Sequence, residues 1–313
     1  MNKICLVGAG RVGEAAAQVL AKEEICQELV LVGVHEGAAQ GAALDLMESA
    51  PLFAFDTQVR GGISLDAVAG ADIVVISAGM ARRPGMSRSD VLDANAPIVA
   101  RAAQSVGALA PHALIVVVTN PVDVLTHLAW SQSGLPRARV IGLSGTLDAA
   151  RMAGFIAAES GLSVRDVRAL VIGGHGDTMI PLPRYSTISG IPVGEFLNEA
   201  AMARVVERTR GGGAEILALK KTGSAYDAPG AAIATMVDAV ARNRRRILPC
   251  VCVLDGEYRE SGVAIGVPAV IGAGGVERII ELTLTPAEQQ QFHRSADAIR
   301  TDLARVDITP GPP

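Results

Sequence analysis

Short apolar runs alternate with longer segments of helical periodicity throughout the first half of the chain. The runs predicted as strands cover residues 4–7, 29–32, 73–77, 114–119 and 140–143. The segments predicted as helices cover residues 12–22, 38–48 (closed by Pro51), 90–105 and 123–132. Two of the runs, 73–77 and 114–119, are apolar throughout, which is typical of strands buried on both faces. This alternation predicts a parallel, doubly wound sheet with right-handed crossovers.

The rhythm changes after Ser144. The pattern then predicts helices over 148–160, most of 195–221, 231–242 and 286–306, a strand over 167–172, and an antiparallel meander over 251–272. We therefore expect an α/β protein of two domains. Residues 1–144 form the parallel sheet, and residues 145–313 form a C-terminal α+β domain. Close contact between two such domains predicts a working site in the cleft between them.

Composition excludes several classes of protein. Hydrophobic residues make up 50% of the 313 residues, which excludes a disordered chain. A formal net charge of −4 and an aromatic content of 3% argue against nucleic-acid binding. The nearest approach to a membrane span, residues 263–276, is broken by Pro268 and several glycines. The N-terminus leaves no room for a signal peptide and the four cysteines are scattered, so we expect a soluble, cytoplasmic protein.

A glycine-rich turn, Gly8-Ala9-Gly10-Arg11-Val12-Gly13, follows the first predicted strand and opens the first predicted helix. Gly8 allows the tight turn, Gly10 lets a pyrophosphate approach the backbone, and Gly13 lets the helix pack closely on the strand. The phosphates would lie at a helix N-terminus, where free N–H groups favour anions. This context predicts a Rossmann-type dinucleotide-binding domain whose cofactor contacts are Gly8, Gly10, Arg11, Val12 and Gly13.

The end of the second predicted strand leaves the choice between NAD and NADP open. An acidic residue normally holds the adenine ribose at this point, but the position is Gly33. The nearest acid is Glu36, in the following turn. Losing the acid removes the repulsion of a 2′-phosphate, yet residues 33–44 offer no Lys or Arg to bind that phosphate, only His35. Backbone amides around Val34 and His35 are the remaining candidates for this contact.

Three further groups of residues carry chemistry if they come together. Residues 79–88 place three arginines in a loop with proline and glycine hinges, although such a loop alone is more typical of a solvated surface. Asp148 and Arg151 lie on one face of a helix, a spacing that is usually a surface ion pair. His175 lies between glycines at a strand end, where a lone histidine is more often structural.

Taken together, these groups predict carbonyl reduction. A histidine with a pKa near neutrality exchanges a proton, and a carboxylate fixes its tautomer. Planar guanidinium groups suit the bidentate capture of a carboxylate. Hydride transfer to a carbonyl leaves negative charge on oxygen, which a positioned Arg and an Asn stabilise. A cationic loop that closes over the substrate would exclude water.

Six ordered motifs make the chain resemble the lactate/malate dehydrogenase family, closest to its lactate-dehydrogenase-like bacterial malate dehydrogenases. The resemblance covers nearly the whole length. The motifs are the glycine-rich turn, Ala81-Arg82-Arg83-Pro84-Gly85-Met86-Ser87-Arg88, Thr119-Asn120-Pro121-Val122-Asp123, Leu147-Asp148-Ala149-Ala150-Arg151, Gly174-His175-Gly176-Asp177-Thr178-Met179 and Lys221-Thr222-Gly223-Ser224-Ala225.

The resemblance implies a role for each catalytic candidate. His175 exchanges the proton of the substrate hydroxyl, and Asp148 orients His175 and stabilises its protonated form. Arg151 binds the carboxylate next to the reacting carbon. Arg88, delivered by the loop, polarises the ketone, and Asn120 donates a hydrogen bond near the same oxygen.

The resemblance also implies the substrate. In malate dehydrogenases the first Arg of the loop binds the distal carboxylate, and here that position is Arg82. Lactate enzymes of this pattern carry an uncharged residue there, so Arg82 favours oxaloacetate over pyruvate. Ser224 is expected in the wall of the substrate site. The remaining expected cofactor contacts are Gly33, Val34, Asn95, Thr119 and Asn120. The departure from the family pattern is Gly33, where NAD-using members normally have Asp.

The resemblance thus implies a malate dehydrogenase of the tricarboxylic acid cycle that needs no metal and forms a homodimer or homotetramer. A lactate or broader 2-hydroxyacid dehydrogenase is the alternative within the enzyme class. A metal-dependent glycosidase with a similar N-terminal domain would need a Cys/His site, for which only Cys250 and Cys252 are available. A non-catalytic dinucleotide sensor is the third alternative, which the joint presence of the catalytic candidates disfavours.

Overall fold

The computed structural model describes residues 1–35, 37–80, 86–221 and 223–306, and for Arg88 the backbone alone. Glu36 and the part of the predicted cationic loop that contains Arg82 lie outside the described residues. Among the residues described, no helix is both long enough and apolar enough to cross a bilayer.

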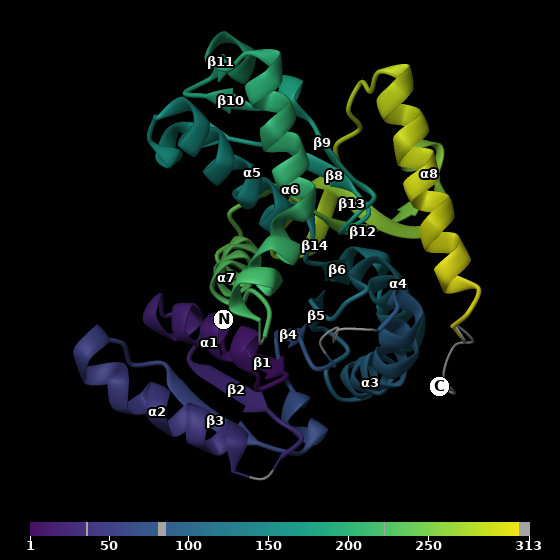
Figure 1. Cartoon of the computed structure of the whole chain (residues 1–313). Helices are drawn as coiled ribbons and strands as arrows, with labels where there is room; N and C mark the ends of the chain where they lie inside the picture. Colours follow the sequence, from purple (N-terminus) through teal and green to yellow (C-terminus); the bar gives the residue numbers. More distant parts are fainter. Residues whose placement is uncertain (36, 81–85, 222, 307–313) are drawn as a thin grey trace.

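Six parallel strands form the N-terminal half of the main sheet, in the order β3-β2-β1-β4-β5-β6. They are β1 (Lys3–Val7), β2 (Glu28–Val32), β3 (Gln58–Gly62), β4 (Ile73–Ile76), β5 (Leu114–Val117) and β6 (Val140–Gly142). The helices α1 (Arg11–Lys22), α2 (Ala38–Phe53), α3 (Arg88–Leu109) and α4 (Val122–Ser133) connect them (Figure 1). The prediction of a doubly wound, Rossmann-type sheet is confirmed.

The strand order reverses at β1, which pairs with β2 on one side and with β4 on the other. Ligands of such sheets bind at the carboxyl ends of the strands where this reversal occurs. β4 and β5 are buried at every position, as their uninterrupted apolar sequence predicted. The glycine-rich turn therefore lies at the switch point of the sheet, next to the fully buried strand β4.

The same sheet continues into the C-terminal half and counts eleven strands over the described ranges. β12 (Arg246–Asp255) pairs antiparallel with β6, and β13 (Ser261–Gly272), β8 (Val171–Gly173), β9 (Met179–Pro181) and β14 (Gly275–Ile279) follow. A small second sheet contains β7 (Val167–Arg168), β10 (Thr187–Ile188) and β11 (Ile191–Pro192).

Four longer helices complete this half: α5 (Gly145–Ser160), α6 (Glu199–Lys220), α7 (Asp227–Ala241) and α8 (Pro286–Leu303). Figure 1 shows α5 and α6 on one side of the sheet and α8 on the other. α7 packs directly on α1, where a Cβ added at Gly230 would lie 2.8 Å from the backbone of Ala15. The shared sheet and this close helix pair join the two halves of the chain.

The predicted helix closed by Pro51 is wrong at its end. α2 continues through Pro51 to Phe53 and stops where Ala54 adopts a left-handed conformation (φ 57°). Pro51 removes one backbone hydrogen bond close to this end, and the helix stops three residues later.

The structure also corrects one strand prediction and adds a strand that the sequence did not predict. Residues 167–172 form two strands in different sheets, because Val167 pairs with β10 whereas Val171 pairs with β9. β3 was not predicted, because its sequence Gln-Val-Arg-Gly-Gly contains a single fully buried residue, Val59. β3 lies at the edge of the sheet and is covered on one face alone, so few of its residues need to be apolar.

Candidate active site

The turn between β1 and α1 has a backbone that fits a dinucleotide phosphate. Gly8 has a φ of +126°, and a Cβ there would lie 2.5 Å from the amide nitrogen of Ala78. At Gly13 a Cβ would lie 1.9 Å from the carbonyl oxygen of Gly8, so only glycine lets α1 approach this closely. Gly10 has open space beside it and gives α1 no side-chain cap, so the first-turn N–H groups of α1 suit an anion.

The ribose end of this region is tightly packed. The N–H of Gly33 donates to the carbonyl oxygen of Gly62 at 2.9 Å. A Cβ at Gly33 would lie 3.2 Å from the Cβ of Ala39 and 3.4 Å from the Cβ of Ala9. The next residue, Val34, is 83% exposed. An acid at position 33 would therefore need α2 to give way slightly.

Asn95 and Thr119 tie together the carboxyl ends of β4 and β5. The buried Asn95 amide accepts from the N–H of Met80 at 2.7 Å and donates to the carbonyl oxygens of Met80 at 3.1 Å and Asn120 at 2.8 Å. Thr119 donates its hydroxyl to the carbonyl oxygen of Ala78 at 2.7 Å. Both predicted cofactor residues thus hold the backbone at the carboxyl ends of β4 and β5, whereas Asn120 is exposed.

His175 and Asp148 form the predicted pair. The imidazole Nδ1 lies 2.8 Å from Oδ2 of Asp148, whose side chain is 1% exposed. Burial opposes protonation of His175, but the charges of Asp148 and Asp123 outweigh this effect and raise the pKa of the imidazole. Because Nδ1 is occupied by the carboxylate, Nε2 is the nitrogen available for proton exchange.

Arg151 shares the same carboxylate. Its Nη1 donates to Oδ1 of Asp148 at 3.0 Å, and only 13% of the arginine side chain is exposed. Its buried Nε has no hydrogen-bond partner among the described residues. Gly212 of α6 lies against the stem of Arg151, since a Cβ there would be 3.3 Å from Cδ. The arginine thus keeps a buried donor that a ligand carboxylate can satisfy.

Two backbone contacts that the sequence did not predict hold His175 in place. The N–H of His175 donates to Oδ2 of the fully buried Asp123 in α4 at 2.9 Å. The N–H of Gly174 donates to Oγ of Ser295 in α8 at 2.8 Å. Asp123 belongs to one of the six motifs, but a carboxylate in the first turn of a helix also has an ordinary structural explanation.

The other predicted site residues are placed less fully. Arg88 is the first residue of α3, described by its backbone alone, and Arg82 is outside the described residues. Ser224 is exposed in the segment between α6 and α7. That segment reaches the start of α1, where a Cβ at Gly223 would lie 3.5 Å from a guanidinium nitrogen of Arg11.

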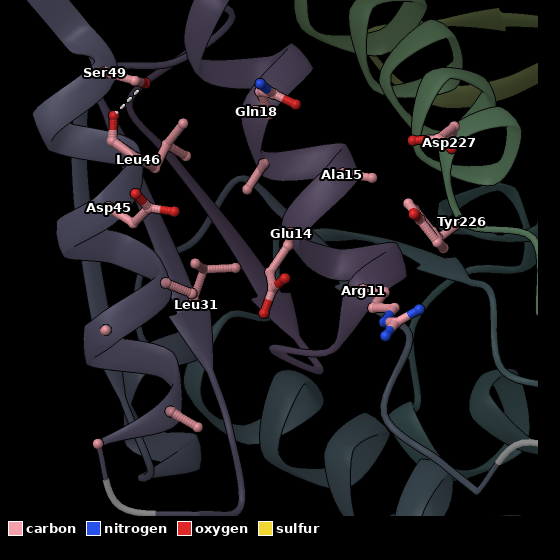
Figure 2. A pocket seen from close by; sticks show the side chains of 15 residues that line it. Arg11, Glu14, Ala15, Gln18, Leu31, Asp45, Leu46, Ser49, Tyr226 and Asp227 are labelled. Atoms are coloured by element: carbon pink, nitrogen blue, oxygen red, sulfur yellow. Dashed lines mark hydrogen bonds between the residues drawn. The ribbon is translucent and has the colours of Figure 1, made fainter. Parts of the chain in front are cut away.

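A cavity of about 670 Å³ lies between α1, α2 and the start of α7. Its polar lining includes Arg11 and Glu14 of α1, Asp45 of α2, Tyr226 and, in α7, Asp227 (Figure 2). The guanidinium of Arg11 lies 5.6 Å from the centre of the Tyr226 ring. His175 and the glycines of the turn are not part of this lining. The cavity therefore shares Arg11 with the predicted cofactor contacts but does not include the histidine–aspartate pair.

The residues present do not fit the metal-dependent alternative. Cys250 and Cys252 face the core with their sulfurs 3.7 Å apart, and both are buried. The contact with Cys250 and burial raise the pKa of Cys252 well above its usual value, so its thiol stays protonated. No group of three or more His, Cys, Asp or Glu side chains with metal-binding geometry occurs in the part of the chain that the structure describes.

A Rossmann-type sheet with an open glycine turn, combined with a hydrogen-bonded histidine–aspartate pair, is typical of an oxidoreductase that uses a nicotinamide dinucleotide. Comparison with known proteins agrees. The model of the lactate/malate dehydrogenase NAD binding domain matches residues 2–142, and that of the lactate/malate dehydrogenase alpha/beta C-terminal domain matches residues 145–307.

Individual relatives cover almost the whole chain. The malate dehydrogenase of Nitrosococcus oceani is 60% identical over 306 residues, 98% of each chain. The solved malate dehydrogenase of Salinibacter ruber is 43% identical, with a TM-score of 0.92 over 96% of each chain. The lactate dehydrogenase of Cryptosporidium parvum, solved with lactic acid and β-nicotinamide adenine dinucleotide, is 35% identical, with a TM-score of 0.94 over 98% of each chain. The chain belongs to the lactate/malate dehydrogenase family, as its motifs predicted.

Proposed function

We propose that the protein is a malate dehydrogenase that interconverts (S)-malate and oxaloacetate with a nicotinamide dinucleotide. The observation that carries this proposal is the buried carboxylate of Asp148, which holds both His175 and Arg151. One side chain thereby orients a proton-exchanging group and a carboxylate-binding group toward the same substrate. The high identity to relatives named malate dehydrogenase supports the same reading.

A run of hydrogen bonds supports a common site for cofactor and substrate. Thr119 and Asn95 hold the loops at the ends of β4 and β5, beside the glycine turn. The next helical turn after β5 supplies Asp123, which bonds the backbone of His175. The acid–base group is thus anchored to the edge of the sheet at which a dinucleotide binds.

In the proposed reaction the nicotinamide ring, when bound, supplies or accepts the hydride. Protonated His175 gives the proton from Nε2 to the ketone oxygen of oxaloacetate, and the neutral imidazole removes it from malate. Asp148 stabilises the protonated ring. Arg151 binds the carboxylate beside the reacting carbon through its fork of N–H donors. We assign Arg88 and Asn120 to the substrate oxygen on the strength of the family motifs.

Recognition of the second carboxylate is assigned to Arg82. An unpaired guanidinium against the methyl group of pyruvate would be costly, which disfavours the lactate alternative. Arg82→Gln is expected to gain activity on pyruvate and to lose most activity on oxaloacetate. Steady-state kinetics with both substrates tests this. A variant that ignores pyruvate and keeps full oxaloacetate turnover would refute the role of Arg82.

For the cofactor we propose NAD preference or dual use. Position 33 offers no carboxylate to repel NADP, but residues 33–44 also offer no Lys or Arg to attract its phosphate. Initial rates of oxaloacetate reduction with NADH and NADPH at matched, subsaturating concentrations test this choice. A strong NADPH preference would contradict the proposal, and no turnover with either cofactor would refute the enzyme function itself.

We further propose that the chain divides into a cofactor domain of residues 1–144 and a catalytic domain of residues 145–313, and that it assembles as a homodimer or homotetramer. α2 supports assembly, because Leu44, Leu52 and Phe53 on it are 62%, 85% and 41% exposed. Light scattering coupled to size-exclusion chromatography measures the mass of the assembly. A monomer at micromolar concentration would contradict this proposal.

A further inference from the structure

Two carboxylates, on two different helices, surround His175. Asp148 of α5 bonds the imidazole, and Asp123 of α4 bonds the backbone N–H of the same residue at 2.9 Å. Asp123 is 0% exposed and Asp148 is 1% exposed. One buried carboxylate thus holds the ring of His175, and a second holds its backbone.

Three charged groups act on the protonation of the imidazole. The carboxylates of Asp148 from α5 and Asp123 from α4 favour the protonated form, whereas the guanidinium of Arg151, also from α5, opposes it. α8 contributes the neutral Ser295. The two carboxylates outweigh burial and Arg151, so their placement favours a protonated His175.

The position of Asp123 in α4 favours its charged form. It is the second residue of the helix (Val122–Ser133), where the partial positive charge of the N-terminus stabilises a carboxylate. Its bond to the N–H of His175 also fixes the loop that follows β8, which contains the left-handed residues Gly173 and Gly176. Asp123 thus acts on both the position and the charge of the imidazole.

We infer that Asp123 is a second positioning residue of the acid–base step, which holds the backbone of His175 and, together with Asp148, stabilises the protonated imidazole. The inference rests on the proposed function for its catalytic meaning. Its physical content, however, is a property of His175 that can be measured without turnover.

The test is an NMR titration of His175 in protein labelled at its histidine rings. The chain has five histidines, and loss of one signal in His175→Asn assigns the resonance. Asp123→Asn, which removes the charge and keeps a side-chain acceptor, is expected to lower the pKa of His175 by about one unit. Ser295→Ala is the matched control, since it removes the neighbouring backbone anchor without changing any charge, and it should leave the pKa in place.

Kinetics give a second readout. Because oxaloacetate reduction requires protonated His175, the alkaline limb of its kcat/KM profile should move to lower pH by the same amount in Asp123→Asn. If Asp123→Asn does not fold, Asp123→Ser makes the same comparison, and Asp123→Glu, which keeps the charge, should titrate like the wild type. An imidazole that titrates identically in the wild type and a neutral variant overturns the inference. A wild type without turnover, whose imidazole still responds to Asp123→Asn, refutes only the proposed function.

Discussion

A methyl group at position 212 tests whether Arg151 anchors the substrate. Gly212 and Gly211 are neighbours in α6, but only Gly212 faces Arg151: its Cβ would lie 3.3 Å from Cδ, whereas a Cβ at Gly211 would meet nothing within 4 Å. Each Gly→Ala change should favour the helix by about 0.5–1 kcal/mol. The two variants thus share their effect on the helix and differ in their contact with Arg151.

The size of the effect follows from the geometry. Carbon atoms prefer separations of about 3.5–4.0 Å, so Arg151 must move by a few tenths of an ångström in Gly212→Ala. The bond to Asp148 and the low exposure of the side chain leave it little freedom to turn away. Since a misplacement of about 1 Å can cost about 100-fold, we expect a loss of about 3- to 10-fold in kcat/KM for oxaloacetate.

The assay is steady-state oxaloacetate reduction by Gly212→Ala and Gly211→Ala, with thermal unfolding of both. The loss should appear mainly in KM for oxaloacetate, with KM for the dinucleotide unchanged and Tm equal to or above that of the wild type. If the two variants have the same KM for oxaloacetate, the reasoning fails, because Arg151 then does not bind the substrate in the position described.

Three further predictions address the acid–base pair, the cofactor and the packing of the two halves. Asp148→Asn should lower kcat about 10- to 100-fold, the equivalent of one charge-assisted hydrogen bond of about 1.5–3 kcal/mol. Because the folded pKa of His175 is raised, its pairing stabilises the protein fully below the ordinary pKa of about 6.5 and less as pH rises through the folded value. The Tm lost in Asp148→Asn should thus be larger at pH 6 than at pH 9, and equal losses would contradict this pairing. Gly33→Asp should raise the ratio of the rates with NADH and NADPH at least about tenfold, because the new carboxylate repels the 2′-phosphate of NADPH. An unchanged ratio would mean that residue 33 does not lie next to the ribose. Gly230→Ala, whose Cβ would lie 2.8 Å from α1, should lower the free energy of unfolding by about 1–3 kcal/mol in thermal unfolding. The control is Gly154→Ala, whose Cβ meets nothing within 4 Å and which should not lower it. Equal stabilities of the two variants would show that α7 moves away from α1 easily.

The parts of the fold that the sequence predicted are those in which burial alone decides the structure. Strands such as β4 and β5 are covered on both faces, so every position is apolar and the run is recognisable. β3 has one covered face at the edge of the sheet and left no such pattern. The apolar pattern of residues 167–172 predicts one strand, because hydrophobicity cannot show that Val167 and Val171 pair with strands of different sheets.

The site shows the same division between local and long-range information. His175 and Asp148 were predicted because their motifs carry a recognisable chemistry at each position. The contact between Asp123 and His175 was not, because it joins residues 52 positions apart and uses a backbone N–H that any residue type would offer. The three hydrogen bonds of the Asn95 amide likewise go to backbone groups. Every residue type offers such groups, so no partner side chain in the sequence indicates the structural role of Asn95.

The residues to which we assign cofactor choice and acid–base chemistry lie in different parts of this molecule. Gly33 is bonded to the β3 edge of the sheet through Gly62 and packs against α2. His175 is held from α4, α5 and α8, on the far side of β1 in the strand order. A substitution at position 33 should therefore change the dinucleotide preference without moving the pH profile. Changes at Asp123 or Asp148 should do the reverse, since neither carboxylate touches the ribose end. On the proposed function, the glycine at position 33 is therefore expected to affect which dinucleotide the enzyme uses without changing proton transfer at His175.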